Sequence, residues 1–208
     1  MASPKKVITD FIESTYKIKV KENYVIVGIS GCVPDMHGDL MDNTQVHNKY
    51  DDTIGWLTAN ERYLVKGTVH PGKKYTQLPM NKDGAFYLKN GLYQAIKARH
   101  FGQEAFNIFG KYPIGGVEGY RDTARKGIHP LIQNPKAKIY KDGTGIDIHA
   151  GGNNENSVDG ASAGCQVILG DYNSPAWLGF KEPLYKSKQR IFLYFLLDYS
   201  DIKKEIEA

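Results

Sequence analysis

Two side chains of types used in covalent catalysis lie close together in one segment of the chain. His149 ends an apolar stretch at residues 145–149, and Cys165 follows 16 positions later, at the start of the apolar stretch 166–169. A cysteine becomes a nucleophilic thiolate when a base lies within hydrogen-bond reach of the thiol. If the two stretches are neighbouring strands, this spacing predicts acyl transfer through Cys165, with His149 as the base.

The residues around this pair are suited to the same chemistry. Because side chains alternate along a strand, Asp147 shares a face with His149, whereas Ile146 and Ile148 face the other way. Ser162 and Gly164 precede the cysteine, and a turn of small residues allows backbone N–H groups to face a developing oxyanion. We expect Ser162 either to add a hydroxyl donor there or to hold the turn.

Other interpretations of these residues remain open. A cysteine at the start of an apolar strand can simply be a small buried hydrophobe, which is our expectation for Cys32. Asp147 and His149 could present two zinc ligands on one face, but no third ligand follows at a recognisable spacing, so we predict no metal and no cofactor. We expect ordinary polar roles for the remaining histidines, which are His37, His47, His70, His100 and His129.

The elements that must position these side chains are mostly strands. Residues 4–16 have helical apolar spacing behind Pro4, and Pro175 begins a second short helix over 175–180. Short apolar stretches separated by glycine-containing turns predict strands at 24–30, 62–69, 85–88, 114–120, 136–140, 145–149, 166–169 and 190–199. This pattern predicts a mainly β fold, a sandwich or barrel, with a few short helices.

Composition limits the class of protein. The 208 residues predict one domain over 1–208, with the helix at 4–16 as part of it or as a short extension. The net charge of +4 is scattered, which argues against a dedicated nucleic-acid binder. No apolar run is long enough to span a membrane, and the first residues lack the pattern of a signal peptide. We therefore expect synthesis in the cytoplasm.

The motif resembles the catalytic signature of the L,D-transpeptidase (YkuD-like) family. Residues 145–151 (GIDIHAG) and 162–167 (SAGCQV) match its histidine segment followed by a Ser/Thr-x-Gly-Cys segment. Papain-like enzymes place the cysteine first, and sortases place the histidine much farther upstream. Residues 50–55, 66–72 and 120–122 are similar to a phage- or prophage-associated branch of such proteins.

The resemblance implies a role for each matching residue. Cys165 would be the nucleophile, His149 the base and then the acid, and Ser162 with Gly164 the turn that forms the oxyanion site. The family often has an arginine soon after the cysteine, where this chain has Gln166. We therefore expect Arg121, or else Arg125, to anchor a substrate carboxylate, with Asp147 and Gln166 also binding substrate.

The implied function is cleavage of peptidoglycan stem peptides at an L,D linkage. Without a signal peptide, we expect a lytic hydrolase that reaches the periplasm or cell wall through a delivery partner, such as a holin, a phage tail or a secretion apparatus. The alternatives are an L,D-transpeptidase that forms cross-links, a non-catalytic wall-binding or particle structural module that keeps the fold, and a peptidase acting on ordinary proteins.

Overall fold

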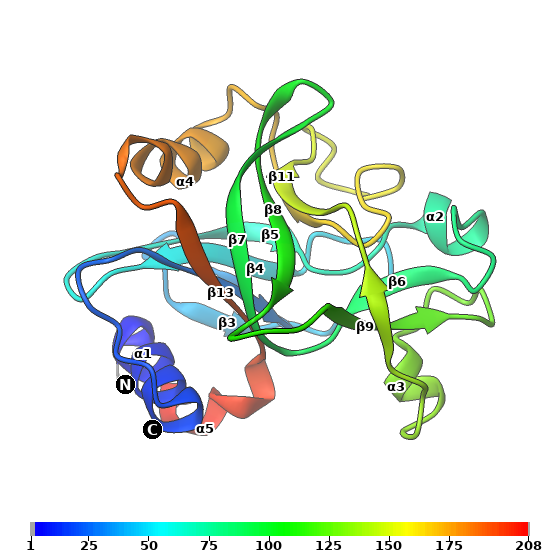
Figure 1. Cartoon of the computed structure of the whole chain (residues 1–208), viewed down its shortest axis with the longest axis horizontal. Coiled ribbons are helices and arrows are strands. Elements are labelled where there is room, and N and C mark those ends of the chain that lie inside the picture. Colours follow the sequence, from blue (N-terminus) through cyan, green and yellow to red (C-terminus); the bar gives the residue numbers. More distant parts are fainter. Residues whose placement is uncertain (1–2, 208) are drawn as a thin grey trace.

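The computed structural model of the protein describes residues 3–207, and most of its regular structure is β-strand (Figure 1). Eight strands close into a barrel with both parallel and antiparallel pairs, in the order β1-β13-β7-β8-β11-β12-β5-β4. The prediction of a mainly β, barrel-like fold with a few short helices is confirmed at this level. The barrel strands are β1 (Val25–Ser30), β4 (Asp52–Leu57), β5 (Arg62–Thr68), β7 (Gly91–His100), β8 (Gln103–Lys111), β11 (Ile146–Ala150), β12 (Gln166–Ile168) and β13 (Ile191–Asp198).

Two small sheets and several helices surround the barrel. The sheets are β10-β9-β6, made of β10 (Tyr140–Gly143), β9 (Val117–Asp122) and β6 (Ala85–Leu88), and the pair β2 (Cys32–Pro34) with β3 (Leu40–Asp42). The helices are α1 (Pro4–Tyr16), α2 (Lys73–Gln77), α3 (Pro130–Gln133), α4 (Pro175–Lys186) and α5 (Lys203–Glu207), with a 3₁₀ turn at Tyr199–Asp201. Within residues 3–207, no helix has the length and apolar character needed to cross a membrane.

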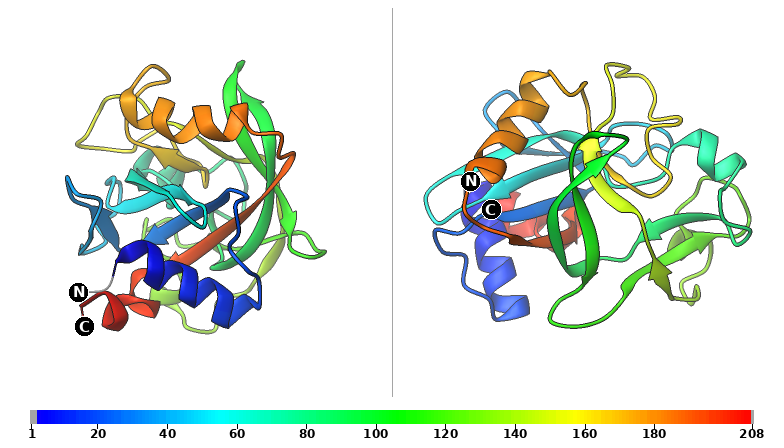
Figure 2. Two further views of the ribbon diagram at one scale, coloured as in Figure 1. Left: turned by 90° about the vertical axis from the view of Figure 1, so that its left-hand side faces the viewer. Right: turned by 45° about the horizontal axis from the view of Figure 1, so that its top comes forward.

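Strands β1 and β13 are apolar along most of their length, and most of their residues are buried on both faces. Ile26 of β1 and Tyr194 of β13 face the barrel interior, whereas Val27 and Phe195 belong to a second apolar cluster outside it. Helix α1 covers that outer cluster with Ile8 and neighbouring apolar side chains, and it lies beside α5 (Figure 2). A strand that is buried on both faces has no apolar–polar alternation, which explains the continuous apolar run of β13.

Helix α4 adds to the interior core. It begins at Pro175, where the Ser174 hydroxyl accepts a hydrogen bond from the Trp177 N–H at 3.2 Å. Its buried side chains Trp177, Phe180 and Leu184 pack with the residues that fill the barrel. The helix start is the predicted one, but the helix continues to Lys186 rather than ending at residue 180.

The main difference from the predicted elements is the long hairpin formed by β7 and β8. The sequence pattern predicts no strand over residues 91–111, yet these two strands pair along their length and connect β13 to β11. The hairpin projects from the barrel (Figure 1), and the second half of β7 is only partly buried, so the apolar signal of a strand fades there. Residues 136–140 were also predicted as a strand, but β10 begins only at Tyr140.

Candidate active site

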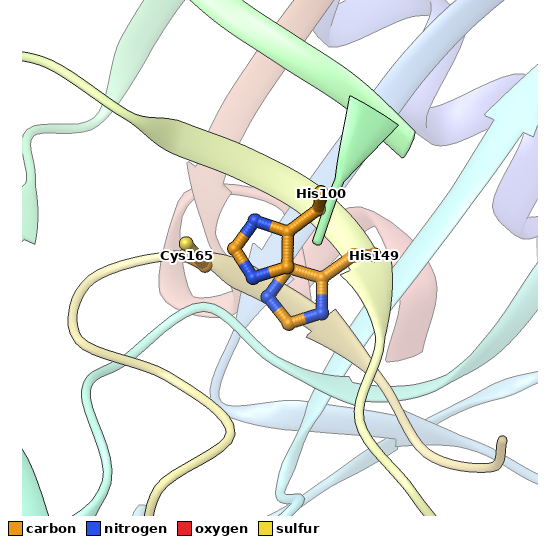
Figure 3. A group of neighbouring side chains, drawn as sticks. All are labelled: His100, His149 and Cys165. Atoms are coloured by element: carbon orange, nitrogen blue, oxygen red, sulfur yellow. The ribbon is translucent and has the colours of Figure 1, made fainter. Parts of the chain in front are cut away.

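The predicted pair meets at two neighbouring strands. Strands β11 and β12 are parallel and in contact, with Ile148 opposite Gln166 and His149 opposite Val167. In this register Cys165, which directly precedes β12, lies beside Asp147, two positions before His149 on β11. One candidate ligand atom each from His149, Cys165 and a third residue, His100, lie within 4.8 Å of one another (Figure 3).

His149 is a buried imidazole with one free nitrogen. It is 4% exposed, and its Nδ1 lies 2.8 Å from the Ala150 carbonyl oxygen. Because a carbonyl can only accept, Nδ1 carries the proton and Nε2 is left as a lone-pair acceptor. Among the residues that the structure describes, Nε2 has no hydrogen-bond partner. Burial, with His100 alongside, lowers the pKa of His149 to about 4.

The Cys165 thiol is also in its neutral form. It is 6% exposed and directs its S–H at the Gly145 carbonyl oxygen, with a sulfur–oxygen distance of 3.6 Å. Burial, with a further contribution from the Asp147 charge, raises the pKa of the thiol to about 12. At neutral pH the resting pair is therefore a thiol and a neutral imidazole, not a thiolate and an imidazolium.

Ser162 and Gly164 hold the turn before the cysteine. The Ser162 hydroxyl donates to the Cys165 carbonyl oxygen at 2.8 Å and accepts from the Gly164 N–H at 3.1 Å. Gly164 has φ = +135°, and a Cβ at this position would lie 2.6 Å from the Phe86 carbonyl oxygen, so only glycine fits. Since the Gly164 N–H is bound to Ser162, it is not free to bind an oxyanion in this conformation, contrary to the expectation for Gly164.

Gln166 faces the barrel interior and not a substrate site. Its side chain is fully buried, accepts a hydrogen bond from the Tyr194 hydroxyl at 2.6 Å and donates to the Gly164 carbonyl oxygen at 3.2 Å. Gly28 makes room for that tyrosine, because a Cβ there would lie 2.2 Å from the hydroxyl oxygen. The predicted substrate-binding role of Gln166 is therefore replaced by a structural one, which is to hold the turn from inside the barrel.

Asp147 binds a histidine that the sequence pattern did not single out. Its Oδ2 lies 2.7 Å from Nδ1 of His100, and its Oδ1 accepts from the Asn107 side-chain amide at 2.7 Å. His100 ends β7, and its ring stacks on that of His149 with centroids 4.1 Å apart and planes at 8°. The sequence analysis predicts that Asp147 binds substrate. In the structure its carboxylate instead holds His100.

No local signal marks His100. His100 and His149 are 49 positions apart in the sequence. The pairing of β7 with β8, and of β8 with β11, brings them together. The one trace in the sequence is the alternation that places Asp147 on the face of His149, where a buried carboxylate needs a partner. A strand acid expected to be buried is the feature that could have prompted a search for a distant partner besides His149.

A pocket of about 340 Å³ opens on Cys165. Its wall is formed by β6, the β10–β11 turn, the tip of the β7–β8 hairpin and the segment before Cys165, with Tyr75 and Asn81 at one side. The wall residues include Phe86, Phe101, Arg121, Gly145 and Ala163. Among the described residues, the wall includes Cys165 and His100 but not His149. The thiol and the His100 ring are therefore the reactive groups that face the pocket.

Arg121 is the arginine at the pocket, and Arg125 is not among the wall residues. The Arg121 guanidinium lies over the rings of Phe86 and Tyr140, at 5.1 and 5.4 Å from their centroids, and donates to the Gly84 carbonyl oxygen at 3.2 Å. Arg125 is exposed. Of the two arginines expected to anchor a carboxylate, only Arg121 lines the same pocket as Cys165 among the described residues.

The three side chains His100, His149 and Cys165 are of types that bind zinc. Ligand lone pairs on a zinc ion must converge on one point, at roughly 2.0–2.1 Å for imidazole nitrogen. Because the two imidazole rings are stacked in nearly parallel planes, their in-plane lone pairs run side by side and do not converge. A metal would fit here only after one ring had turned, and the Asp147–His149 ligand pair considered from the sequence is not formed.

Compared with protein-family models, with curated proteins and with solved structures, the chain matches none of them. The resemblance to L,D-transpeptidases therefore rests on the His149–Cys165 sequence motif alone.

Proposed function

We propose that the protein is a cysteine enzyme that cleaves peptidoglycan stem peptides at an amide bond between an L-configured centre and a D-amino acid. The observation that carries the proposal is the meeting of His149 and Cys165 at the parallel pair β11–β12, beside a pocket that the thiol faces. The proposal includes a YkuD-like fold, which the mainly β barrel supports at the level of fold class.

The contacts of His149 support its role as the base of Cys165. The Ala150 carbonyl holds the tautomer in which Nε2 is unprotonated, and Nε2 has no other partner among the described residues. In the proposed step the S–H turns away from the Gly145 carbonyl, and the thiol closes the remaining gap to this nitrogen, since the candidate ligand atoms of the two side chains lie within 4.8 Å. Transfer of the proton to Nε2 leaves a thiolate, which attacks the substrate carbonyl and forms a thioester as the amine departs.

The neutral resting pair determines when the thiolate forms. With the pKa of the thiol near 12 and that of His149 near 4, charge separation is unfavourable in the empty site. The thiolate is therefore a transient species of the substrate complex, where the attacked carbonyl takes up the negative charge. This arrangement keeps the thiol protonated, and thus unreactive, between turnovers.

The pocket supports a short peptide as substrate. A volume of about 340 Å³ accommodates a few residues. The Arg121 guanidinium at its wall is paired with Asp142 at 3.4 Å, and in the proposal a terminal carboxylate of the substrate shares or replaces that partner. The apolar wall residues Phe86 and Ala163 allow contact with small side chains such as that of alanine. A stem peptide ends in such a carboxylate-bearing D-residue.

We assign the reaction as hydrolysis, in which water resolves the thioester. Resolution by an amine would make the protein a transpeptidase, and an inert thiol would make it a non-catalytic wall-binding module. Because peptidoglycan lies outside the cytoplasmic membrane, any of these roles places the protein in the periplasm or cell wall.

The experiment is mass spectrometry of defined muropeptides incubated with the protein. We expect loss of a terminal D-residue or of a cross-link with the wild type and with Cys32→Ala, whose thiol lies in the separate apolar cluster under α1, and no change with Cys165→Ala. Activity that survives Cys165→Ala would refute the nucleophile. A gain of cross-links would reassign the reaction to transpeptidation, whereas cleavage of casein in place of muropeptides would reassign the substrate.

A further inference from the structure

The proposed reaction needs a proton donor for the leaving amine, and the position of His149 makes it poorly suited for that step. Its ring is 4% exposed and, among the described residues, is not part of the pocket wall. A general acid must approach the leaving nitrogen to hydrogen-bond distance, or act through one water. An amine in the pocket meets the His100 ring instead, because His100 is part of the wall together with Cys165.

His100 is held in an orientation suited to proton transfer. Its Nδ1–H donates to Oδ2 of Asp147 at 2.7 Å, so its Nε2 is the nitrogen left for a substrate. Asp147 is fixed in turn by the Asn107 amide on its other oxygen, at 2.7 Å. The His100 ring stacks on His149 with centroids 4.1 Å apart and meets the Phe101 ring edge-to-face with centroids 4.5 Å apart. At the pocket wall His100 therefore lies near Cys165, with the Asp147 carboxylate behind it on its Nδ1 side.

We propose that His100, positioned by Asp147, exchanges protons with the substrate, whereas His149 serves only the Cys165 thiol. This inference rests on the proposed function and divides between two histidines the acid–base work that the family resemblance assigns to one. In this division of roles, His100 is a catalytic residue because it faces the reacting atoms, and Asp147 is a positioning residue.

The division gives a balanced reaction. In acylation, the thiol proton passes to Nε2 of His149, the sulfur bonds to the carbonyl carbon, the C–N bond breaks, and the amine takes the Nε2 proton of His100. In deacylation, a water gives a proton to His100 as its oxygen bonds to the thioester carbon. The C–S bond then breaks, and the thiolate recovers its proton from His149. Both histidines end in the state in which they began.

The test compares two leaving groups in single-turnover acylation, followed by mass spectrometry of the quenched protein. One substrate is the stem peptide with its D-amino acid amide, and the other is a thiodepsipeptide in which sulfur replaces that amide nitrogen. A thiolate departs without an acid, whereas an amine must be protonated. For His100→Gln we expect a loss of about 10²- to 10⁴-fold in acylation by the amide, with acylation by the thiodepsipeptide within about tenfold of wild type.

Two further variants separate this role from a structural one. His149→Gln should slow acylation by both substrates, because it removes the base of the thiol, and Asp147→Asn should repeat the selective loss of His100→Gln in weaker form. His37→Gln, which changes an exposed histidine away from the pocket, is the matched control. The unfolding midpoint of each variant reports whether it folds, and Asp147→Asn provides the test if His100→Gln does not.

The outcomes are distinguishable. Equal losses on both substrates with His100→Gln, or no loss on either, would overturn the role of His100 while leaving the function intact. A wild type that neither substrate acylates would overturn the proposed function, and this inference with it.

Discussion

The protonation state of Cys165 is the property on which the reaction depends most directly, and it can be measured without a substrate. The thiolate is the species that alkylating reagents attack. With a pKa near 12, about one thiol in 10⁴ is ionised at pH 8, compared with about one in four for an ordinary thiol of pKa about 8.5. Alkylation of Cys165 should therefore be roughly 10³-fold slower than that of a free thiol at this pH.

The assay is alkylation by iodoacetamide between pH 6 and pH 11, with the rate at each cysteine read by peptide mass spectrometry. We expect the logarithm of the Cys165 rate to rise by one unit for each pH unit, without a plateau across this range. Cys32, whose pKa is also raised to about 12 by burial, is the internal control and should show the same slope. Steric shielding lowers both rates but does not change the slope.

A plateau in the Cys165 rate between pH 6 and pH 8 would refute the argument. Such a plateau is the signature of a thiolate held by an imidazolium, and it would mean that burial does not keep the resting pair neutral. The cycle drawn above for His100 and His149 would then start from the wrong protonation states.

Three other predictions test the surroundings of the pair. Gly164→Ala should lower the free energy of unfolding by about 2–4 kcal/mol in urea melts, because of its positive φ and its contact with Phe86. Gly102→Ala, which has φ = +82° but open space at its Cβ, should cost only about 1 kcal/mol, and equal losses would contradict the close contact. Because the unfolded chain protonates a histidine near pH 6.5 and the folded chain protonates His149 only near pH 4, the contribution of His149 to the free energy of unfolding should fall by about 3 kcal/mol as the pH falls between these values. His149→Gln should reduce the pH dependence of the free energy of unfolding in this range by the equivalent of about one bound proton. An unchanged pH dependence would show that the ring is not buried in its neutral form. Arg121→Gln should raise KM about tenfold for muropeptides with a free terminal carboxylate and leave KM unchanged for the matching amides, whereas equal effects on both would rule out a carboxylate anchor.

The sequence by itself determined the features that depend on neighbouring residues. Helix α1 has its predicted bounds, 4–16, because its apolar spacing and its proline are local signals. The alternation along β11 correctly placed Ile148 in the core and His149 on the opposite face, since the period of a strand is set by its backbone. The sequence also predicted that the stretches of His149 and Cys165 are neighbouring strands, but the parallel register that sets His149 opposite Val167, two positions from Cys165, was decided by the tertiary structure.

Only the tertiary structure decided which groups surround that pair. His100 reaches it through the pairing of β7, β8 and β11, and half of β7 projects into solvent, where strand patterning is weak. Gln166 was expected at the substrate but lies inside the barrel. Alternate residues of β12 face its two sides, and on the inner side Gln166 accepts a hydrogen bond from the Tyr194 hydroxyl. The pKa values of Cys165 and His149 belong to the same category: burial moves both towards the neutral form, and burial is a property of the closed barrel and its surrounding loops, not of any local run of residues.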